Sequence, residues 1–215
     1  MSTTYHKIPG PFIRDPKTNT LNWGEWTSPE LDMLQNVPWL FTEKVDGTNV
    51  RVLWDGHRVS FAGRTDNATF HPDLFAYLEE HFGGEDRETL FEQKFGETPV
   101  VIYGEGFGPK IQSGGKYGDT IRLAVFDVKI GGMFLERANV EDIAEYFGVP
   151  TAPVVEKFGP DADLWDGIDL IANGFKSTYG DFLAEGVVGV PAVGLYNRRD
   201  ERIIVKLKTR DLYEE

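Results

Sequence analysis

The stretch Phe41–Asn49 has the sequence FTEKVDGTN, which places Lys44 two residues before an acid and ahead of a Gly-Thr-Asn turn. A lysine amine acts as a nucleophile only after it loses its proton, and free lysine is almost entirely protonated at neutral pH. A reactive lysine therefore needs nearby positive charge, a metal ion or removal from water. Taken alone, this pattern is more typical of a surface lysine beside a hairpin turn, because short motifs often match by chance.

Five further segments follow Lys44 in a fixed order, and each is short and weakly specific when taken alone. They are Gly63-Arg64-Thr65, Tyr103–Gly108 (YGEGFG) after an apolar run, Leu123–Val128 (LAVFDV), Glu185–Gly189 (EGVVG) and Val205–Lys208 (VKLK). Together with the Lys44 stretch they extend from residue 44 to residue 208, which is most of the chain. Six segments in one order are a much stronger signal than any one of them.

In order and approximate spacing, this set resembles the conserved motifs of the lysine-dependent nucleotidyltransferases, which are ATP-dependent ligases and mRNA-capping guanylyltransferases. The details look most like the phage-type, nick-sealing ATP-dependent RNA ligases. Asn49 stands where DNA ligases usually carry arginine, Glu43 directly precedes the lysine, and Gly108–Gln112 (GPKIQ) is similar to their Gly-x-x-Ile-Gln segment. The resemblance implies an α+β nucleotidyltransferase fold, with two twisted, mostly antiparallel sheets flanked by helices and enclosing an ATP cleft.

The catalytic residues that the resemblance implies are three lysines. Lys44 would attack the α-phosphorus of ATP and carry AMP as a phosphoramide. Lys206 and Lys208 would neutralise phosphate charge. Because side chains alternate along a strand, these two lysines are expected on the same face. Without the resemblance, an exposed lysine pair on an edge strand would be the simpler interpretation.

The resemblance also implies nucleotide and metal contacts. Glu185 would bind the catalytic Mg²⁺ or Mn²⁺, since a carboxylate in a strand of small apolar residues is costly unless it is paired or metal-bound. The implied nucleotide contacts are Glu43 to the adenine amino group, Phe126 by stacking on adenine, Glu105 to the ribose, and Asn49 and Arg64 to the ribose or terminal phosphates. A core aromatic and a turn acid are the simpler interpretations of Phe126 and Glu105.

Alternating and amphipathic patterns predict the individual elements. One hairpin is expected from residues 49–54 and 58–62, and a second from residues 121–130 and 133–136, with a last strand over residues 203–208. Helices are expected over residues 72–82, 85–95, 140–147 (capped by Asn139) and 163–173. Strand pairs joined as hairpins favour an α+β domain with mostly antiparallel sheets.

Length and composition set the outer limits. The 215 residues are predicted to form a single nucleotidyltransferase domain over residues 1–215, with residues 1–39 irregular apart from a helical turn after Ser28. The chain is expected to lack the OB-fold or helical domain that ligases usually carry after the last motif. It contains no cysteine and no apolar run long enough for a membrane helix. Without a signal segment, a cytoplasmic protein is expected, in the host cytoplasm if it is viral.

The net charge of −13 argues against a nucleic-acid substrate, because such binding needs a basic surface. Basic residues nevertheless gather near the C-terminus, at Arg198, Arg199, Arg202, Lys206, Lys208 and Arg210. An enzyme that turns over needs only a local positive strip, so weak and salt-sensitive binding is expected.

The sequence thus predicts an ATP-dependent RNA ligase that joins RNA ends or a nicked duplex. It is expected to be a monomer, with a helper protein or end-healing enzyme left open as a partner. Two rivals share the lysine chemistry: a minimal DNA ligase and a capping guanylyltransferase, the latter disfavoured because the chain is short for it. A third rival is a non-catalytic nucleotide- or RNA-binding module of the same fold.

Overall fold

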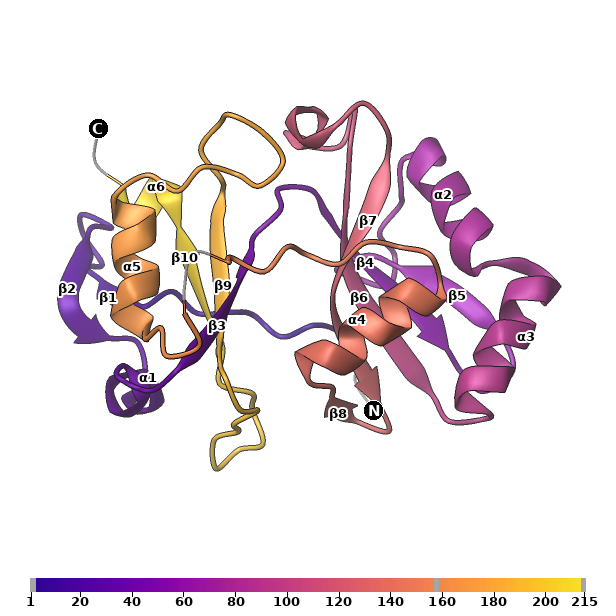
Figure 1. Ribbon diagram of the computed structural model, residues 1–215, viewed down its shortest axis with the longest axis horizontal. Coiled ribbons are helices and arrows are strands. Elements are labelled where there is room, and N and C mark those ends of the chain that lie inside the picture. Colours follow the sequence, from indigo (N-terminus) through magenta and orange to yellow (C-terminus); the bar gives the residue numbers. More distant parts are fainter. Residues whose placement is uncertain (1–2, 157–158, 214–215) are drawn as a thin grey trace. The chain divides into compact units, whose positions relative to one another are not determined.

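The computed structural model describes residues 3–156 and 159–213, and in this part of the chain it forms two compact units (Figure 1). The first unit comprises residues 1–6 and 45–152, and the second comprises residues 7–44 and 153–215. Two compact units can be the halves of one domain, so the predicted single domain over residues 1–215 stays a prediction.

The first unit is built on an antiparallel sheet with the strand order β5-β4-β6-β7-β8 among its described residues. The strands are β4 (Thr48–Trp54), β5 (Val59–Ala62), β6 (Val100–Phe107), β7 (Arg122–Ile130) and β8 (Met133–Phe134). Asp55 closes the first hairpin, because its Oδ1 accepts from the backbone N–H groups of His57 and Arg58 at 2.8 Å each. The hairpin predicted from residues 49–62 is confirmed.

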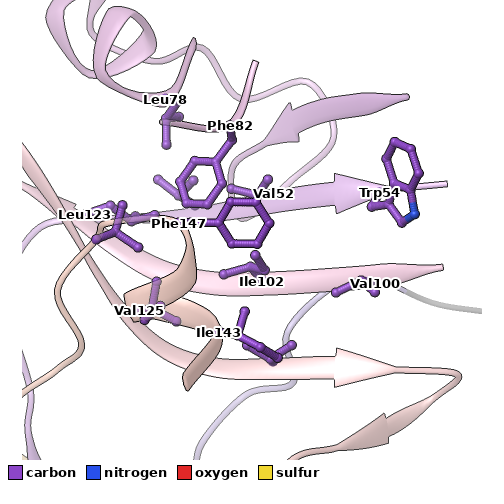
Figure 2. Packing of buried hydrophobic residues seen from close by; sticks show 14 of the residues in the cluster. Val52, Trp54, Leu78, Phe82, Val100, Ile102, Leu123, Val125, Ile143 and Phe147 are labelled. Carbon is purple, nitrogen blue, oxygen red and sulfur yellow. The ribbon is translucent and has the colours of Figure 1, made fainter. Parts of the chain in front are cut away.

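One face of this sheet is covered by three helices: α2 (Pro72–Phe82), α3 (Gly84–Phe95) and α4 (Arg137–Tyr146). Their apolar residues and those of the inner sheet face form one buried cluster, part of which Figure 2 shows. Figure 2 shows Leu78 and Phe82 of α2 in the same buried cluster as Val52 and Ile102 of the sheet. This burial is the main source of stability for the unit, at roughly 25 cal/mol per Å² of apolar surface removed from water.

A β-bulge interrupts the pairing of β6 with β7. Tyr103 pairs with Asp127, whereas its neighbour Gly104 pairs with Val125, so Phe126 is the extra residue. The bulge reverses the alternation, since Val125 and Val128 both belong to the buried cluster. Phe126 and Asp127 therefore both face away from that core.

The second unit contains an antiparallel sheet with the order β10-β9-β3 among the described residues. Its elements are β1 (Phe12–Arg14), β2 (Leu21–Trp26), α1 (Pro29–Leu34), β3 (Trp39–Glu43), α5 (Leu164–Ala172), β9 (Gly186–Pro191), β10 (Val205–Lys208) and α6 (Thr209–Leu212). A second apolar cluster joins the sheet to α5, and Phe41 of β3 packs so close to Gly167 that a side chain there would lie 2.5 Å from its ring.

The structure differs from the predicted elements at two places. Residues 12–26 form the β1-β2 hairpin where irregular structure was predicted, because Asp15 turns the chain by accepting from the N–H groups of Lys17 and Thr18. Helix α4 begins at Arg137 with Glu136 as its N-cap, so Asn139 lies in the first turn and is not the cap. Helix α1 follows Ser28, whose side chain caps it as predicted.

Among the described residues, no helix is both long enough and apolar enough to cross a membrane.

Candidate active site

Lys44, Glu185 and Lys208 form an ion-paired cluster in the second unit. The Nζ of Lys44 donates to Oε2 of Glu185 at 2.6 Å, and the Nζ of Lys208 donates to Oε1 of the same carboxylate at 2.6 Å. The three side chains retain 24%, 19% and 14% of their exposure, so the cluster is shielded but still open to solvent. Three of the predicted site residues therefore meet at one carboxylate, although Lys44 and Glu185 are 141 positions apart in the sequence.

The strand register places these lysines on either side of Gly186. Lys208 of β10 pairs with Gly186 of β9, and the backbone N–H of Lys44 donates to the Gly186 carbonyl at 2.9 Å. Gly186 has a φ of +148°, and a side chain there would lie 1.9 Å from the carbonyl oxygen of Leu207. Any larger residue would push β10 away, so this glycine keeps the two lysines within reach of Glu185.

Two opposing influences set the charge of Glu185. Burial opposes ionisation, but the positive charges and hydrogen bonds of Lys44 and Lys208 outweigh it, so the pKa of Glu185 lies below its usual value. The carboxylate is thus ionised at neutral pH and can act as an oxygen ligand for a hard cation. Among the described residues there is no group of three or more His, Asp or Glu side chains that could hold a metal ion.

Lys206 lies on the same face of β10 as Lys208. Val205 and Leu207, which alternate with the two lysines along the strand, are buried on the opposite face, and this confirms the predicted alternation. Across the sheet, Lys206 pairs with Val188, and Val188 pairs with Thr42. Lys206 and Lys208 therefore share one face of this sheet, and Lys44 follows directly after β3. The roles of these three lysines stay predictions.

Glu43 points to the other side of the sheet and is 1% exposed. Its Oε1 accepts from the Ser177 hydroxyl at 2.5 Å, and its Oε2 accepts from the N–H and hydroxyl of Thr178 at 2.8 and 2.7 Å. This carboxylate therefore anchors the loop that leads to Glu185. An adenine amino group would have to share the Glu43 carboxylate with these donors or displace one of them, so the predicted adenine contact stays a prediction. Ser177 and Thr178 lie outside all the sequence motifs, and no sequence signal pointed to them.

In the first unit, Asn49 and Glu105 are direct cross-strand neighbours in the pairing of β4 with β6. Both lie on the sheet face opposite the buried cluster, as does Phe126 at the bulge. The Oδ1 atom of Asn49 is buried and has no hydrogen-bond partner among the residues that the structure describes. A buried acceptor without a donor is energetically costly. Arg64 lies just beyond β5 and is exposed.

The N-terminal residues contribute to this same face, although no sequence pattern predicted it. The hydroxyl of Tyr5 donates to Oδ2 of Asp127 at 2.5 Å, and its ring meets the Phe126 ring edge-on with centroids 5.2 Å apart. Because the bulge turns Phe126 and Asp127 the same way, one tyrosine contacts both. Phe126 is thus a half-buried ring with a fixed neighbour, and not a core residue.

A buried arginine ties the N-terminal residues to the sheet. The Arg51 side chain is fully buried and donates to the Gly63 carbonyl, the Thr3 hydroxyl and the Asp66 carboxylate at 2.7–2.8 Å. Tyr103 adds a bond from its hydroxyl to the Thr3 carbonyl at 3.0 Å, and burial raises the pKa of Tyr103 to about 12. This phenol therefore stays neutral at neutral pH.

The turn after Lys44 is fixed at two points within the first unit. The backbone N–H of Asp46 donates to the Tyr117 hydroxyl at 3.1 Å. A side chain on Gly47 would lie 2.2 Å from the Gly106 carbonyl, so only glycine allows this approach. The Lys-x-Asp-Gly pattern therefore reflects a steric need of the fold as well as any chemistry.

A family model described as RNA ligase matches residues 37–208. No curated protein matches the chain.

Solved structures of similar fold include a Naegleria gruberi RNA ligase in several states. A mutant with AMP and Mn is 14% identical, covering 85% of this chain and 52% of that one, with a TM-score of 0.64. A mutant with ATP and Mn is 15% identical over 98% and 60%, with a TM-score of 0.65, and the form with PPi is 14% identical over 98% and 60%, at 0.64. This likeness confirms the predicted α+β nucleotidyltransferase fold. The present chain spans only 52% to 60% of those three chains.

Proposed function

The chain belongs to the RNA ligase family, and on this premise we propose that it is an ATP-dependent RNA ligase. Lys44 attacks the α-phosphorus of ATP, and the bond to pyrophosphate breaks as the nitrogen–phosphorus bond forms. The AMP then passes from Lys44 to an RNA 5′-phosphate, and a neighbouring 3′-hydroxyl displaces it to form the phosphodiester. The observation that carries this proposal is the ion-paired cluster, in which the Glu185 carboxylate accepts hydrogen bonds from the Nζ atoms of Lys44 and Lys208 at 2.6 Å each.

The charges of the cluster suit phosphoryl transfer, which depends mainly on positioning and on stabilising negative charge. Lys206 and Lys208 supply two ammonium groups on one sheet face to neutralise the phosphates. Glu185 is the residue proposed to hold Mg²⁺ or Mn²⁺, which when bound neutralises phosphate charge and orients it. A single carboxylate fits this role, because Mg²⁺ is usually held by one or two carboxylates together with substrate phosphates.

The nucleotide contacts are proposed for the outer sheet face of the first unit. Asn49 has the buried acceptor without a donor, which a ribose hydroxyl would satisfy, and Glu105 beside it is proposed to bind the ribose as well. Phe126 is proposed to stack on adenine, and the exposed Arg64 to contact the ribose or the terminal phosphates. These assignments rest on the family motifs and on the shared face of Asn49, Glu105 and Phe126.

Glu43 can be tested for two roles at once. Glu43→Ala leaves three donors of Ser177 and Thr178 without an acceptor, so we expect the free energy of unfolding to fall by about 2–4 kcal/mol. We also expect the unmutated protein to prefer ATP strongly over GTP, and the variant to lose part of that preference. Urea unfolding and labelling with each nucleotide measure the two effects, with the exposed Glu92→Ala as control. A destabilised variant that keeps the full ATP preference would assign Glu43 to anchoring the loop alone.

The substrate is tested by sealing nicked duplexes with ATP and Mg²⁺. We expect sealing when the strand that supplies the 3′-hydroxyl is RNA, because Asn49 and the GPKIQ segment resemble the nick-sealing RNA ligases. Equal sealing of an all-DNA nick would favour the rival minimal DNA ligase. Binding of ATP and RNA with no covalent product would favour the rival non-catalytic module. The phage type, the monomeric state, a cytoplasmic location and a helper or end-healing partner remain predictions.

A further inference from the structure

The loop of residues 192–204, which joins β9 to β10, is an ordered hairpin. Asn197 organises its tip, since its Oδ1 accepts from the N–H groups of Arg199 and Glu201 at 2.9 and 3.0 Å. Backbone bonds from Asn197 to Glu201 and from Ile203 to Leu195 close the hairpin at 2.9 Å each. In Figure 1 the loop extends beyond the end of its own sheet. Its tip is therefore presented in a defined shape.

The tip exposes two arginines side by side. No hydrogen bond or ion pair joins the side chain of Arg198 or Arg199 to another residue in the described ranges, and both are exposed. The side-chain amide of Asn197 donates a hydrogen bond to the neighbouring Glu201 carboxylate at 2.8 Å. One of the two acidic side chains of the loop is therefore directed toward the hairpin itself. Tyr196 at the base of the tip is 45% exposed. Two guanidinium groups and a phenol thus face solvent together.

This surface stands out against the charge of the whole chain. The loop of residues 192–204 contains three basic and two acidic residues, whereas the whole chain carries a net charge of −13. Guanidinium groups bind phosphates through paired hydrogen bonds, and a tyrosine hydroxyl can donate to a phosphate oxygen. An acidic protein that acts on a polyanion needs such a local contact, because phosphate neutralisation and counterion release supply most of its affinity.

The position of the tip separates it from the lysine cluster. Strand β9 begins at Gly186, beside Glu185, and ends at Pro191, where the loop begins; β10 returns from the loop to Lys208. The loop therefore lies at the opposite end of these strands, roughly 17 Å away at about 3.3 Å per residue. That distance corresponds to several base-pair steps of an A-form RNA duplex.

We propose that the hairpin tip with Tyr196, Arg198 and Arg199 binds the phosphate backbone of the RNA substrate several base pairs away from the ends being joined. The proposal rests on the proposed RNA ligase function and adds a substrate contact outside the ATP-binding residues.

The test compares Arg198→Ala/Arg199→Ala with the unmutated protein in binding to a nicked RNA duplex over a range of salt concentrations. Two lost phosphate contacts should weaken binding roughly tenfold at low salt and reduce the slope of log K against log salt by about two. The KM for sealing should rise similarly. Self-adenylylation, which needs no RNA, should keep its rate. Arg198→Lys/Arg199→Lys should retain most of the salt slope.

The control is Lys17→Ala/Arg58→Ala, which removes the same charge from exposed positions elsewhere. Shortening the duplex arms to about four base pairs on each side of the nick should abolish the difference between the arginine variant and the unmutated protein. The proposal is overturned if the arginine variant binds like the control, or if its self-adenylylation falls. Absence of self-adenylylation in the unmutated protein would contradict the proposed function instead, and the RNA-binding comparison would still test the loop.

Discussion

Lys44→Ala is expected to abolish transfer of AMP from ATP to the protein, and Lys44→Arg is expected to do no better. Alanine has no nucleophile, and arginine keeps its positive charge but stays protonated at any usable pH. The expected loss is at least about a thousandfold, as is usual when the nucleophile of a covalent mechanism is removed. The measurement is retention of label from α-labelled ATP on the denatured protein.

Lys44→Arg also serves as the structural control for this experiment. Arginine can keep the ion pair with Glu185 that Lys44 makes at 2.6 Å, so the variant should unfold at nearly the same urea concentration as the unmutated protein. If Lys44→Arg still took up AMP, Lys44 would not be the nucleophile and the assignment of the cluster would be wrong.

Sealing of pre-adenylylated RNA is expected to distinguish the role of Lys44 from that of Glu185. A strand supplied with AMP already on its 5′-phosphate does not need the lysine adenylate, so Lys44→Ala should seal it at a rate near that of the unmutated protein. Glu185→Ala should lose sealing by about a hundredfold or more, because the carboxylate holds Lys208 in place and is proposed to hold the metal. Gel separation of joined and unjoined strands measures both rates.

The matched control in the sealing assay is Glu92→Ala, which removes an exposed glutamate from α3. Glu185→Gln refines the result, since glutamine keeps much of the shape but not the charge. Sealing by Glu185→Ala at the rate of the control would show that this carboxylate serves only the first step, contrary to the proposed metal role.

Local sequence patterns predicted the helices and strands that form through interactions between nearby residues or by burying one face. The helix over residues 72–82 agrees with α2, since its apolar residues recur at helical spacing and Pro72 and Gly83 mark its ends. The shared face of Lys206 and Lys208 was also predictable, because alternation along a strand requires it. For the same reason the α+β character and the antiparallel hairpins could be inferred before the structure.

Features that depend on tertiary register could not be inferred from the sequence. The bulge that turns Phe126 and Asp127 the same way follows from how β6 pairs with β7, and no local pattern marks it. The contact of Tyr5 with Asp127 joins residues 122 positions apart, and that of Ser177 with Glu43 joins residues 134 apart. These contacts decide whether a predicted residue has free hydrogen-bonding capacity, and for Glu43 they supply partners that the motif alone did not suggest.

The predicted start of α4 shows the limit of capping rules. Asn139 is a good N-cap residue, yet the helix begins at Arg137, three residues before the predicted start at residue 140. The Arg137 side chain bonds Glu141 one turn later, the Thr151 hydroxyl and the Ala152 carbonyl at 2.7–2.8 Å. These bonds stabilise a first helical turn that the N-cap preferences of the residues did not predict.

The central claim is that Lys44 becomes covalently linked to AMP. The most direct measurement is incubation of the unmutated protein with α-labelled ATP and Mg²⁺, followed by a denaturing gel, acid treatment and mapping of the labelled peptide. We predict label that survives denaturation, is released by acid as expected of a phosphoramide, and lies on the peptide that contains Lys44. Label on another residue, or no label from ATP, would contradict the account.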